Sequence, residues 1–282
     1  MLLLHKVNNM LSFPNAKINL GLNIIERRPD QFHNIETIFY PVPIADILEI
    51  IESTELKGNK VEIVITGMDI PGDSENNLCV KAYKLMDKLY HLPPVKIHLH
   101  KIIPTGAGLG GGSSDGAFTL SLLNGLFSLN LTNAQLIDHA AELGSDCPFF
   151  IENKPAFGTE KGNILKTIAL NLSGYYFVLV KPSVSVGTAE AYKGVKPLKP
   201  EQSVNALVKL PIALWKDKIV NDFEQSIFPN HSIIKQIKND FYDAGAIYAS
   251  MTGSGSAVYG IFEKQVSFKN VSQHEFYWAK YL

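Results

Sequence analysis

A dense run of glycines constrains this chain more than any other feature of its sequence. The run reads Pro104-Thr-Gly-Ala-Gly-Leu-Gly-Gly-Gly-Ser-Ser-Asp-Gly-Ala117, with six glycines from Gly106 to Gly116, between a strand-like and a helix-like segment. Residues without a Cβ allow successive N–H groups to turn into one concave surface, and the following helix directs its positive N-terminus to the same place. A plain connection of about two to six residues does not need so many glycines. The run therefore predicts a phosphate-binding loop.

Two common phosphate-binding folds share part of this pattern, and its surroundings exclude both. Gly106 to Gly111 satisfies G-x-G-x-x-G, but a dinucleotide-binding fold needs a second parallel strand after the helix, and residues 132–143 predict another helix. A Walker A loop needs a lysine directly before its serine, whereas here Gly112 precedes Ser113. Any lysine that serves this loop comes from elsewhere in the chain.

The periodicity of apolar residues predicts a mixed α and β chain. Alternation over residues 17–25 predicts a strand with one buried face, and Lys17 and Asn19 lie together on its polar face. The other expected strands are 61–66, 95–101, 175–181, 246–251 and 257–263, and the expected helices are 78–89, 114–129, 132–143 and 232–242. The Lys154-Pro155 pair predicts a boundary between two domains, residues 1–154 and 155–282.

Length and charge narrow the class of protein. A chain of 282 residues is long enough for two modest domains, and 26 Lys and Arg against 27 Asp and Glu leave no basic surplus for nucleic acid. No apolar run approaches the ~20 residues of a membrane span. The two cysteines, Cys79 and Cys147, are too few for a disulfide framework, which favours a reducing compartment. We therefore expect a cytoplasmic monomer or weak homodimer without nucleic-acid or membrane partners.

Three separated motifs together resemble the GHMP kinases, a family of ATP-dependent kinases of small molecules. They are Ala16-Lys-Ile-Asn-Leu-Gly-Leu22, the glycine run, and Met251-Thr-Gly-Ser-Gly-Ser-Ala257, in the family's order. The resemblance implies a two-domain α+β fold, the first domain like the second domain of ribosomal protein S5 and the second ferredoxin-like, with ATP between them. It also implies Mg²⁺ beside ATP, because the loop alone does not neutralise the β and γ phosphate oxygens.

Three further segments resemble a subset of GHMP kinases, those whose small-molecule substrate is a cytidine diphosphate-linked methylerythritol. They are Arg28-Pro-Asp-Gln-Phe-His33, Leu143-Gly-Ser-Asp-Cys-Pro-Phe149 and Asn221-Asp-Phe-Glu224. The chain departs from this subset at Gln31, where the family has glycine, at Phe32, where it has tyrosine, and at Asn163, where it has glutamate. Phe32 keeps a ring for stacking but has no phenol hydroxyl for a hydrogen bond.

The resemblance maps a catalytic pair onto this chain. Asp146 matches the family's catalytic aspartate and would accept or orient the proton of the attacking hydroxyl. Lys17 would pair with Asp146 and polarise the same hydroxyl. Asn19 follows about 6 to 7 Å further along the same strand face and would bind substrate beside Lys17.

The resemblance also implies the residues that hold ATP and the cytidyl substrate. The ATP-binding set is Asn77, Lys101, Pro104, Gly106, Gly108, Leu109, Gly110, Gly111, Gly112, Ser113 and Ser114. The substrate-binding set is Asn19, Phe32, His33, Thr188 and Tyr192. Within it, Phe32 and Tyr192 would sandwich the cytosine while His33 reads its hydrogen-bonding edge. The two serines are also expected to cap the helix that follows them.

No acidic cluster in the sequence predicts protein ligands for Mg²⁺, so we assign none. His98 and His100 share one strand face, but a third ligand is missing, and we interpret them as exposed strand residues.

Two other functions compete with this interpretation. The first is a GHMP kinase that acts on homoserine, mevalonate or a sugar, which leaves the Phe32-His33 pair unexplained. The second is a nucleotide-binding or sensor protein without catalysis, which requires neither Lys17 nor Asp146.

Overall fold

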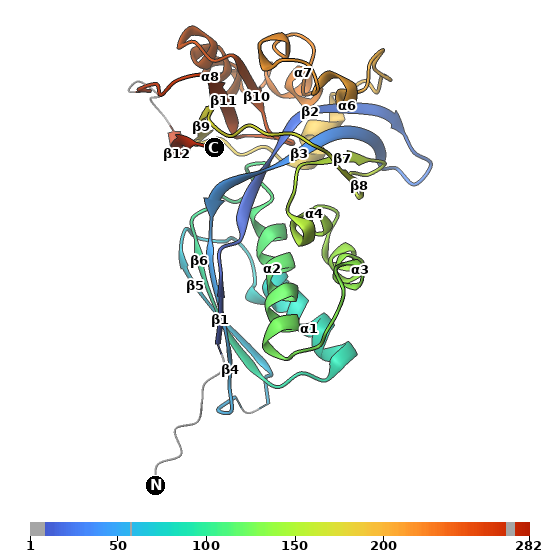
Figure 1. The fold of residues 1–282 in the computed structure, drawn as a ribbon, viewed down its shortest axis with the longest axis vertical. Helices are drawn as coiled ribbons and strands as arrows, with labels where there is room; N and C mark the ends of the chain where they lie inside the picture. The colour runs from blue at the N-terminus through green and yellow to red at the C-terminus, as the bar shows by residue number, and fades with distance from the viewer. Residues whose placement is uncertain (1–8, 57, 269–273) are drawn as a thin grey trace. The chain divides into compact units, whose positions relative to one another are not determined.

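The computed structural model describes residues 9–56, 58–268 and 274–282, and the chain divides into two compact units (Figure 1). The first unit comprises Met1–Ala16, Ile44–Ile103 and Gly110–Asn153, and the second comprises Lys17–Pro43, Pro104–Leu109 and Lys154–Leu282. The domains expected from the sequence, 1–154 and 155–282, stay a prediction, and residues 1–8, 57 and 269–273 of them lie outside the described residues. Residues 17–22 of the first motif and residues 104–109 of the glycine loop thus group with the C-terminal part of the chain, whereas the loop from Gly110 onward belongs to the first unit.

The first unit contains a four-stranded sheet. Its strands follow the order β1 (Asn9–Ser12), β4 (Ile47–Glu52), β6 (Val95–Lys101) and β5 (Val61–Gly67). β5 pairs with β6 in parallel, and the other neighbours are antiparallel. Leu99 is fully buried while its neighbour His98 is exposed, because successive side chains of a strand point to opposite faces. The predicted strands 61–66 and 95–101 are therefore confirmed.

Five helical segments lie in the described part of the first unit. They are η1 (Ser74–Asn76), α1 (Leu78–Tyr90), α2 (Gly111–Leu126), α3 (Asn133–Leu143) and α4 (Cys147–Glu152). Helix α3 begins after Thr132, whose side chain forms a reciprocal capping box with Gln135, and it ends at Gly144, as predicted. Helix α4 was not predicted; it is only six residues long, and Pro148 lies in its first turn, where the missing N–H is tolerated.

A second sheet carries the first motif. Its order is β2 (Asn15–Arg27), β3 (His33–Ala45), β7 (Ala156–Thr159) and β8 (Ile164–Thr167). The predicted strand 17–25 is confirmed within β2, but its predicted solvated polar face is wrong. Lys17 and Asn19 are only 3% and 2% exposed. Their polar ends find partners inside the protein, so the alternation marks two buried faces of different polarity.

The C-terminal sheet has the strand order of a ferredoxin-like domain. The order is β10 (Tyr248–Met251), β11 (Val258–Phe262), β9 (Tyr176–Pro182) and β12 (His274–Tyr281), all antiparallel (Figure 1). Helix α8 (Ser232–Asp243) packs on β10 and β11, and its Ile237 and Phe241 join one buried core with Val178 and Val258. Predicted strands 175–181, 246–251 and 257–263 and helix 232–242 are confirmed within about two residues.

Shorter helices connect β9 to α8. They are α5 (Thr188–Lys193), α6 (Val204–Leu207), η2 (Ile212–Leu214) and α7 (Phe223–Ile227). Strand β12 was not predicted, and no helix lies between β11 and β12 in residues 263–268, the part of that connection that the structure describes.

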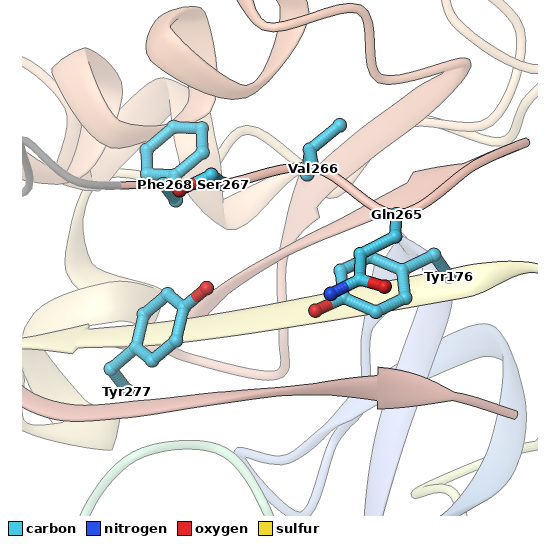
Figure 2. A pocket seen from close by; sticks show the side chains of 6 residues that line it. All are labelled: Tyr176, Gln265, Val266, Ser267, Phe268 and Tyr277. Carbon is cyan, nitrogen blue, oxygen red and sulfur yellow. The ribbon is translucent and has the colours of Figure 1, made fainter.

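An open cavity of about 570 Å³ lies beside strands β9 and β12 (Figure 2). Its lining residues are Tyr176, Gln265, Val266, Ser267, Phe268 and Tyr277. It shares no residue with the predicted site. None of the helices in the described parts of the chain is both long enough and apolar enough to cross a membrane.

Candidate active site

The glycine loop leads directly into helix α2. Gly106, Gly108 and Gly110 have φ values of 63°, 75° and 69°, in the left-handed region that glycine adopts without strain. Gly110 is the N-cap of α2 and has no side chain, so the N-cap residue supplies no acceptor for the N–H groups of the first turn. Uncapped N–H groups at a helix N-terminus are a favourable environment for a phosphate.

The glycines of the loop serve two different purposes. A Cβ on Gly108 would lie 2.0 Å from the carbonyl oxygen of Thr252, and one on Gly111 would lie 2.9 Å from Ile103 Cγ2. These two positions therefore require glycine for packing within the protein. Gly106 and Gly112, in contrast, have no atom within 4 Å of a built Cβ. At Gly106 and Gly112 the absence of a side chain therefore leaves open space for a ligand.

Ser113 and Ser114 do not cap helix α2, contrary to the prediction. The helix begins at Gly111, three residues earlier than expected, so both serines lie inside its first turn and a half. Ser113 instead hydrogen-bonds the thiol of Cys147, whose pKa is raised by burial to about 11. Ser114 is fully buried, and within the described part of the chain its Oγ has no hydrogen-bond partner. A buried polar atom without a partner is rare in folded proteins.

Lys17 is held in place by two acceptors. Its Nζ lies 2.6 Å from Asn19 Oδ1 and 2.8 Å from the carbonyl oxygen of Gly108. The amide of Asn19 is fixed in turn, since its Nδ2 donates to Thr37 Oγ1 over 3.0 Å. Asn19 thus orients Lys17, and its role as a substrate ligand stays a prediction. The strand-face pairing of Lys17 and Asn19 predicted from the sequence is confirmed.

The third motif closes over the same residues. Thr252 Oγ1 accepts from the backbone N–H of Asn19 at 3.0 Å and donates to the carbonyl oxygen of Gly108 at 3.2 Å. Gly253, with a φ of 55°, approaches Gly108 so closely that a Cβ there would lie 3.2 Å from its Cα. The second unit therefore brings together parts of all three motifs, which lie at residues 16–22, 104–117 and 251–257 of the sequence.

Asp146, the other catalytic candidate, belongs to the first unit. It precedes helix α4 as its N-cap residue, is half-buried, and makes no side-chain capping hydrogen bond. Its pairing with Lys17 stays a prediction.

The expected cytidine-binding residues lie in the second unit. The ring stacked on Tyr192 is that of His33, with centroids 4.7 Å apart and planes 19° from parallel. Phe32 is 59% exposed, and Lys161 Nζ lies 4.9 Å from its ring centroid. Phe32 is therefore not a core aromatic residue. Thr188 opens helix α5, with its Oγ1 3.5 Å from Ser254 Oγ.

Two departures from the family pattern have clear structural roles. Gln31 has a φ of 70°, so it adopts the left-handed backbone that glycine would adopt without strain. The loop is closed by hydrogen bonds between Arg28 and Phe32 and between Gln31 and Arg28. Asn163 Oδ1 accepts from Lys161 N at 3.2 Å in the turn between β7 and β8, so it stabilises that turn.

Two family models match the chain. The model for the GHMP kinases N terminal domain matches residues 77–154, and the model for the GHMP kinases C terminal domain matches residues 206–274. A relative from Bacteroides thetaiotaomicron, named 4-diphosphocytidyl-2-C-methyl-D-erythritol kinase, is 54% identical over 256 residues, covering 91% of this chain and 93% of the relative. A relative of the same name from Bacteroides fragilis is 51% identical over 258 residues, with coverage of 91% and 93%. This chain belongs to the GHMP kinases.

A solved structure supports the same assignment. The crystal structure of 4-(cytidine 5'-diphospho)-2C-methyl-D-erythritol kinase matches this GHMP kinase with a TM-score of 0.76 and 31% identity, covering 89% of this chain and 90% of that chain. The two-domain α+β GHMP kinase fold predicted from the sequence is therefore confirmed.

Two predicted ATP ligands of this GHMP kinase already have partners inside the first unit. Asn77 caps helix α1, and its Oδ1 accepts from Cys79 N at 2.8 Å. Lys101 is 2% exposed, and its Nζ bonds Asp46 at 2.5 Å and Asp115 at 2.8 Å. Their contacts with ATP stay predictions.

The Asp46–Lys101–Asp115 cluster was missed by sequence reasoning. Asp46 Oδ1 also accepts from the N–H groups of Ile102 and Ile103, at 2.6 and 2.8 Å. The cluster thereby ties the strand that enters the glycine loop to the first turns of the helix that leaves it. A lysine seen alone at a strand end gives no signal of this arrangement, because its carboxylate partners are 55 and 14 residues away.

The cluster holds two carboxylates against one ammonium. The pKa of Asp115 is raised to about 7, because burial and the repulsion of Asp46 raise it by more than the attraction of Lys101 lowers it. Burial lowers the pKa of Lys101, but the attraction of both carboxylates outweighs burial, and the net direction is upward. Asp115 Oδ1 has no hydrogen-bond partner within the described residues, while its Oδ2 accepts from Lys101 Nζ.

The raised pKa of Asp115 predicts a dependence of stability on pH. The folded protein keeps a proton up to about pH 7 that the unfolded chain releases above its ordinary pKa of 3.8. This contribution to stability is full below 3.8, is lost as the pH rises toward 7, and is absent above it. Its slope is at most about 1.4 kcal/mol per pH unit. Urea unfolding of the wild type and of Asp115→Asn between about pH 5 and pH 8 measures it.

We expect the stability of Asp115→Asn relative to wild type to increase over that interval, because the variant lacks the titrating group. Asp138→Asn, an exposed residue of helix α3, is the control and should run parallel to wild type. Parallel curves for Asp115→Asn and wild type would show that Asp115 is not protonated in the folded protein.

Proposed function

We propose that this protein transfers the γ-phosphoryl group of ATP to the 2-hydroxyl of 4-diphosphocytidyl-2-C-methyl-D-erythritol, in the non-mevalonate route to isoprenoid precursors. The observation that carries the proposal is the 54% and 51% identity, across 91% of the chain, to two relatives named as kinases of this compound. The chain also has the glycine loop and both candidate catalytic side chains at matching positions. Such a reaction depends on positioning and charge neutralisation more than on covalent chemistry.

The first turn of helix α2 supplies the phosphate-binding groups in this proposal. Three features of the structure fit a bound polyphosphate. The turn has no side-chain cap, a Cβ on Gly112 would meet open space, and the buried Ser114 Oγ has no partner within the described residues. The partial positive charge of the helix N-terminus favours an anion at the same place.

Mg²⁺ would accompany ATP in the proposed reaction and neutralise charge on the β and γ phosphates. The described residues contain no group of three His, Cys, Asp or Glu side chains suited to a metal ion. Mg²⁺ usually keeps several waters and is bound through substrate phosphates and one or two carboxylates, without a dedicated cage of protein ligands. We therefore assign no protein ligand to it.

Asp146 and Lys17 perform the proton chemistry of the proposed reaction. Asp146 accepts the proton of the 2-hydroxyl while the hydroxyl oxygen bonds to the γ phosphorus. The bond between the γ phosphorus and the β-phosphate oxygen breaks, and ADP leaves. Lys17 stabilises the negative charge that develops on the attacking oxygen. Its ammonium is suited to this because Gly108 and Asn19 fix its position, which removes the entropy cost of ordering a flexible lysine.

The cytidine diphosphate group would be recognised by Phe32, His33 and Tyr192. An exposed aromatic ring such as Phe32 is available for stacking on a base, and the His33–Tyr192 stack offers a second flat surface. Burial lowers the pKa of His33, and the charge of Arg27 lowers it further, so the ring is neutral near pH 7. A neutral imidazole presents one donor and one acceptor, which suits the edge of cytosine.

Gly112→Ala tests the phosphate site without disturbing the fold. We expect ATP affinity to fall about tenfold or more, because the new methyl group occupies the open space and displaces charge-assisted hydrogen bonds. Stability should stay equal or rise, since alanine is the better helix former. Calorimetric ATP titration and urea unfolding measure both quantities. Native ATP affinity in Gly112→Ala would place the phosphates elsewhere.

Asp146→Asn tests the general base. We expect turnover to fall by about 10² or more, the scale of a lost proton acceptor, with ATP affinity nearly unchanged. Asp138→Asn removes an exposed carboxylate of the same unit and should leave both quantities at wild-type values. Steady-state ADP release with the cytidyl substrate, beside ATP titration, separates the two effects. Near-native turnover in Asp146→Asn would remove Asp146 from the catalytic role.

Phe32→Ala tests the recognition of cytosine. Stacking on a base is worth ~1 to 3 kcal/mol, so kcat/KM for the cytidyl substrate should fall roughly 5- to 150-fold. The melting temperature should not change, because Phe32 is 59% exposed. Leu214→Ala, at a residue 50% exposed, is the control for losing an exposed apolar side chain. An unchanged preference for the cytidyl substrate over an acceptor without the nucleotide would contradict the stacking model.

A further inference from the structure

The segment Asn221–Glu224 surrounds the turn that carries the third motif. Asn221 is 2% exposed and precedes helix α7. Its Nδ2 donates to two backbone carbonyls, those of Met251 and Gly253, each at 2.8 Å. Its Oδ1 accepts from Phe223 N at 3.1 Å. One side chain thus fixes both ends of a three-residue turn whose middle residue is Thr252.

Glu224 holds the start of the same turn. Its Oε1 accepts from Met251 N at 2.9 Å and from Ser250 Oγ at 3.2 Å. Its Oε2 is paired with Lys238 of helix α8 at 2.5 Å, which balances the charge of this nearly buried carboxylate. Backbone N–H and C=O of Met251 are therefore both bound by this segment.

The turn transmits this order to the catalytic lysine. Thr252 Oγ1 bonds Asn19 N and the carbonyl oxygen of Gly108, at 3.0 and 3.2 Å. Lys17 Nζ bonds the same carbonyl of Gly108 and the side chain of the same Asn19. Asn221 is therefore linked to Lys17 through the turn, because Gly108 and Asn19 contact both Thr252 and Lys17. Every member of this chain of contacts belongs to the second unit.

The neighbouring Asp222 connects the segment to the strand that carries Lys17. Its Oδ2 accepts from Ile24 N at 2.7 Å, and its backbone N–H donates to Leu22 O at 2.8 Å. Residues 221 and 222 thus bind strand β2 and the turn of the third motif at the same time. This arrangement fixes the position of Lys17 relative to the loop residue Gly108.

We propose that Asn221 is a positioning residue for phosphoryl transfer, which holds the Met251–Gly253 turn so that Thr252 keeps Gly108 and Asn19 in place around Lys17. The proposal rests on the proposed kinase function. This role differs from that of a residue that only stabilises the fold, because loss of the Asn221 side chain displaces Asn19 and Gly108, two partners of the Lys17 ammonium.

The test is a double-mutant cycle on turnover. Asn221→Leu removes the two donated hydrogen bonds, and Thr252→Val removes the hydroxyl that contacts Asn19 and Gly108 while keeping nearly the same shape. We expect each single variant to lower kcat at least about tenfold, the scale of a hydrogen bond lost beside a charged group. We expect the kcat of the double variant to be little lower than that of the less active single variant, because both substitutions act through one turn.

Two controls separate positioning from stability. Tyr242→Phe removes a hydroxyl that bonds Ala249 on β10, so it destabilises the same sheet without touching the turn. Compared with Asn221→Leu at an equal loss of melting temperature, Tyr242→Phe should keep kcat within about twofold of wild type. Its effect on kcat should be independent of that of Thr252→Val, so that the fold-changes of the two single variants multiply in the double variant. Thr252→Ser keeps the hydroxyl and should restore most of the turnover that Thr252→Val loses. If Asn221→Leu does not fold, Asn221→Asp, which keeps the size and the acceptor for Phe223, replaces it in the cycle.

Each outcome decides one hypothesis. A wild-type enzyme that does not phosphorylate the cytidyl substrate overturns the proposed function, whatever the variants do. If the wild type is active, two results overturn the positioning role alone. One is an Asn221 variant with the same kcat as Tyr242→Phe, and the other is a double variant whose loss of kcat is the product of the losses in Asn221→Leu and Thr252→Val. A coupled loss of kcat at preserved fold, with rescue by Thr252→Ser, supports it.

Discussion

The close approach of Gly108 to the turn around Thr252 is the contact on which the arrangement of the second unit's motifs depends. With 2.0 Å between a built Cβ and the Thr252 carbonyl oxygen, no residue other than glycine fits at position 108. The same carbonyl of Gly108 accepts from Lys17, and the same Thr252 hydroxyl holds Asn19. A steric constraint of the backbone therefore sets the position of a charged side chain.

A second constraint is electrostatic and lies within the first unit. Lys101 is buried between Asp46 and Asp115, and removing a charge from water requires partners of opposite sign. The ammonium joins the end of β6 to the first turns of α2, so the two segments that flank the glycine loop are fixed by one group. We interpret this cluster as a brace for the loop, independent of any contact with nucleotide.

The residues proposed to recognise the substrate in the second unit are arranged differently. Phe32 stands exposed on a short loop whose Gln31 has a left-handed backbone, while His33 stacks on Tyr192. Because the Phe32 ring is not packed in the core, its exposed face is available for stacking on a ligand. Gln31 stands where the family has glycine, and its left-handed backbone carries strain of about 1 to 2 kcal/mol.

Local patterns in the sequence determined a large part of this protein. Apolar periodicity placed β5, β6, α1 and α8, Thr132 and Gln135 marked the start of α3, and three motifs indicated the family. These features depend on residues a few positions apart, which one reading of the chain reveals. The start of α2 was misjudged, because glycines conceal the first turn of a helix that tertiary packing stabilises.

Only the tertiary structure decided what each motif residue does. The hydrogen bond from Asn19 to Thr252 joins residues 233 positions apart, and the ion pair of Lys101 with Asp46 joins residues 55 apart. Such contacts form when packing brings distant segments together, and no local pattern encodes them. For the same reason the sequence could not show that Lys17 is buried, that Gly108 is needed for packing while Gly112 leaves open space, or that Asn221 holds the third motif: each depends on neighbours supplied by the fold.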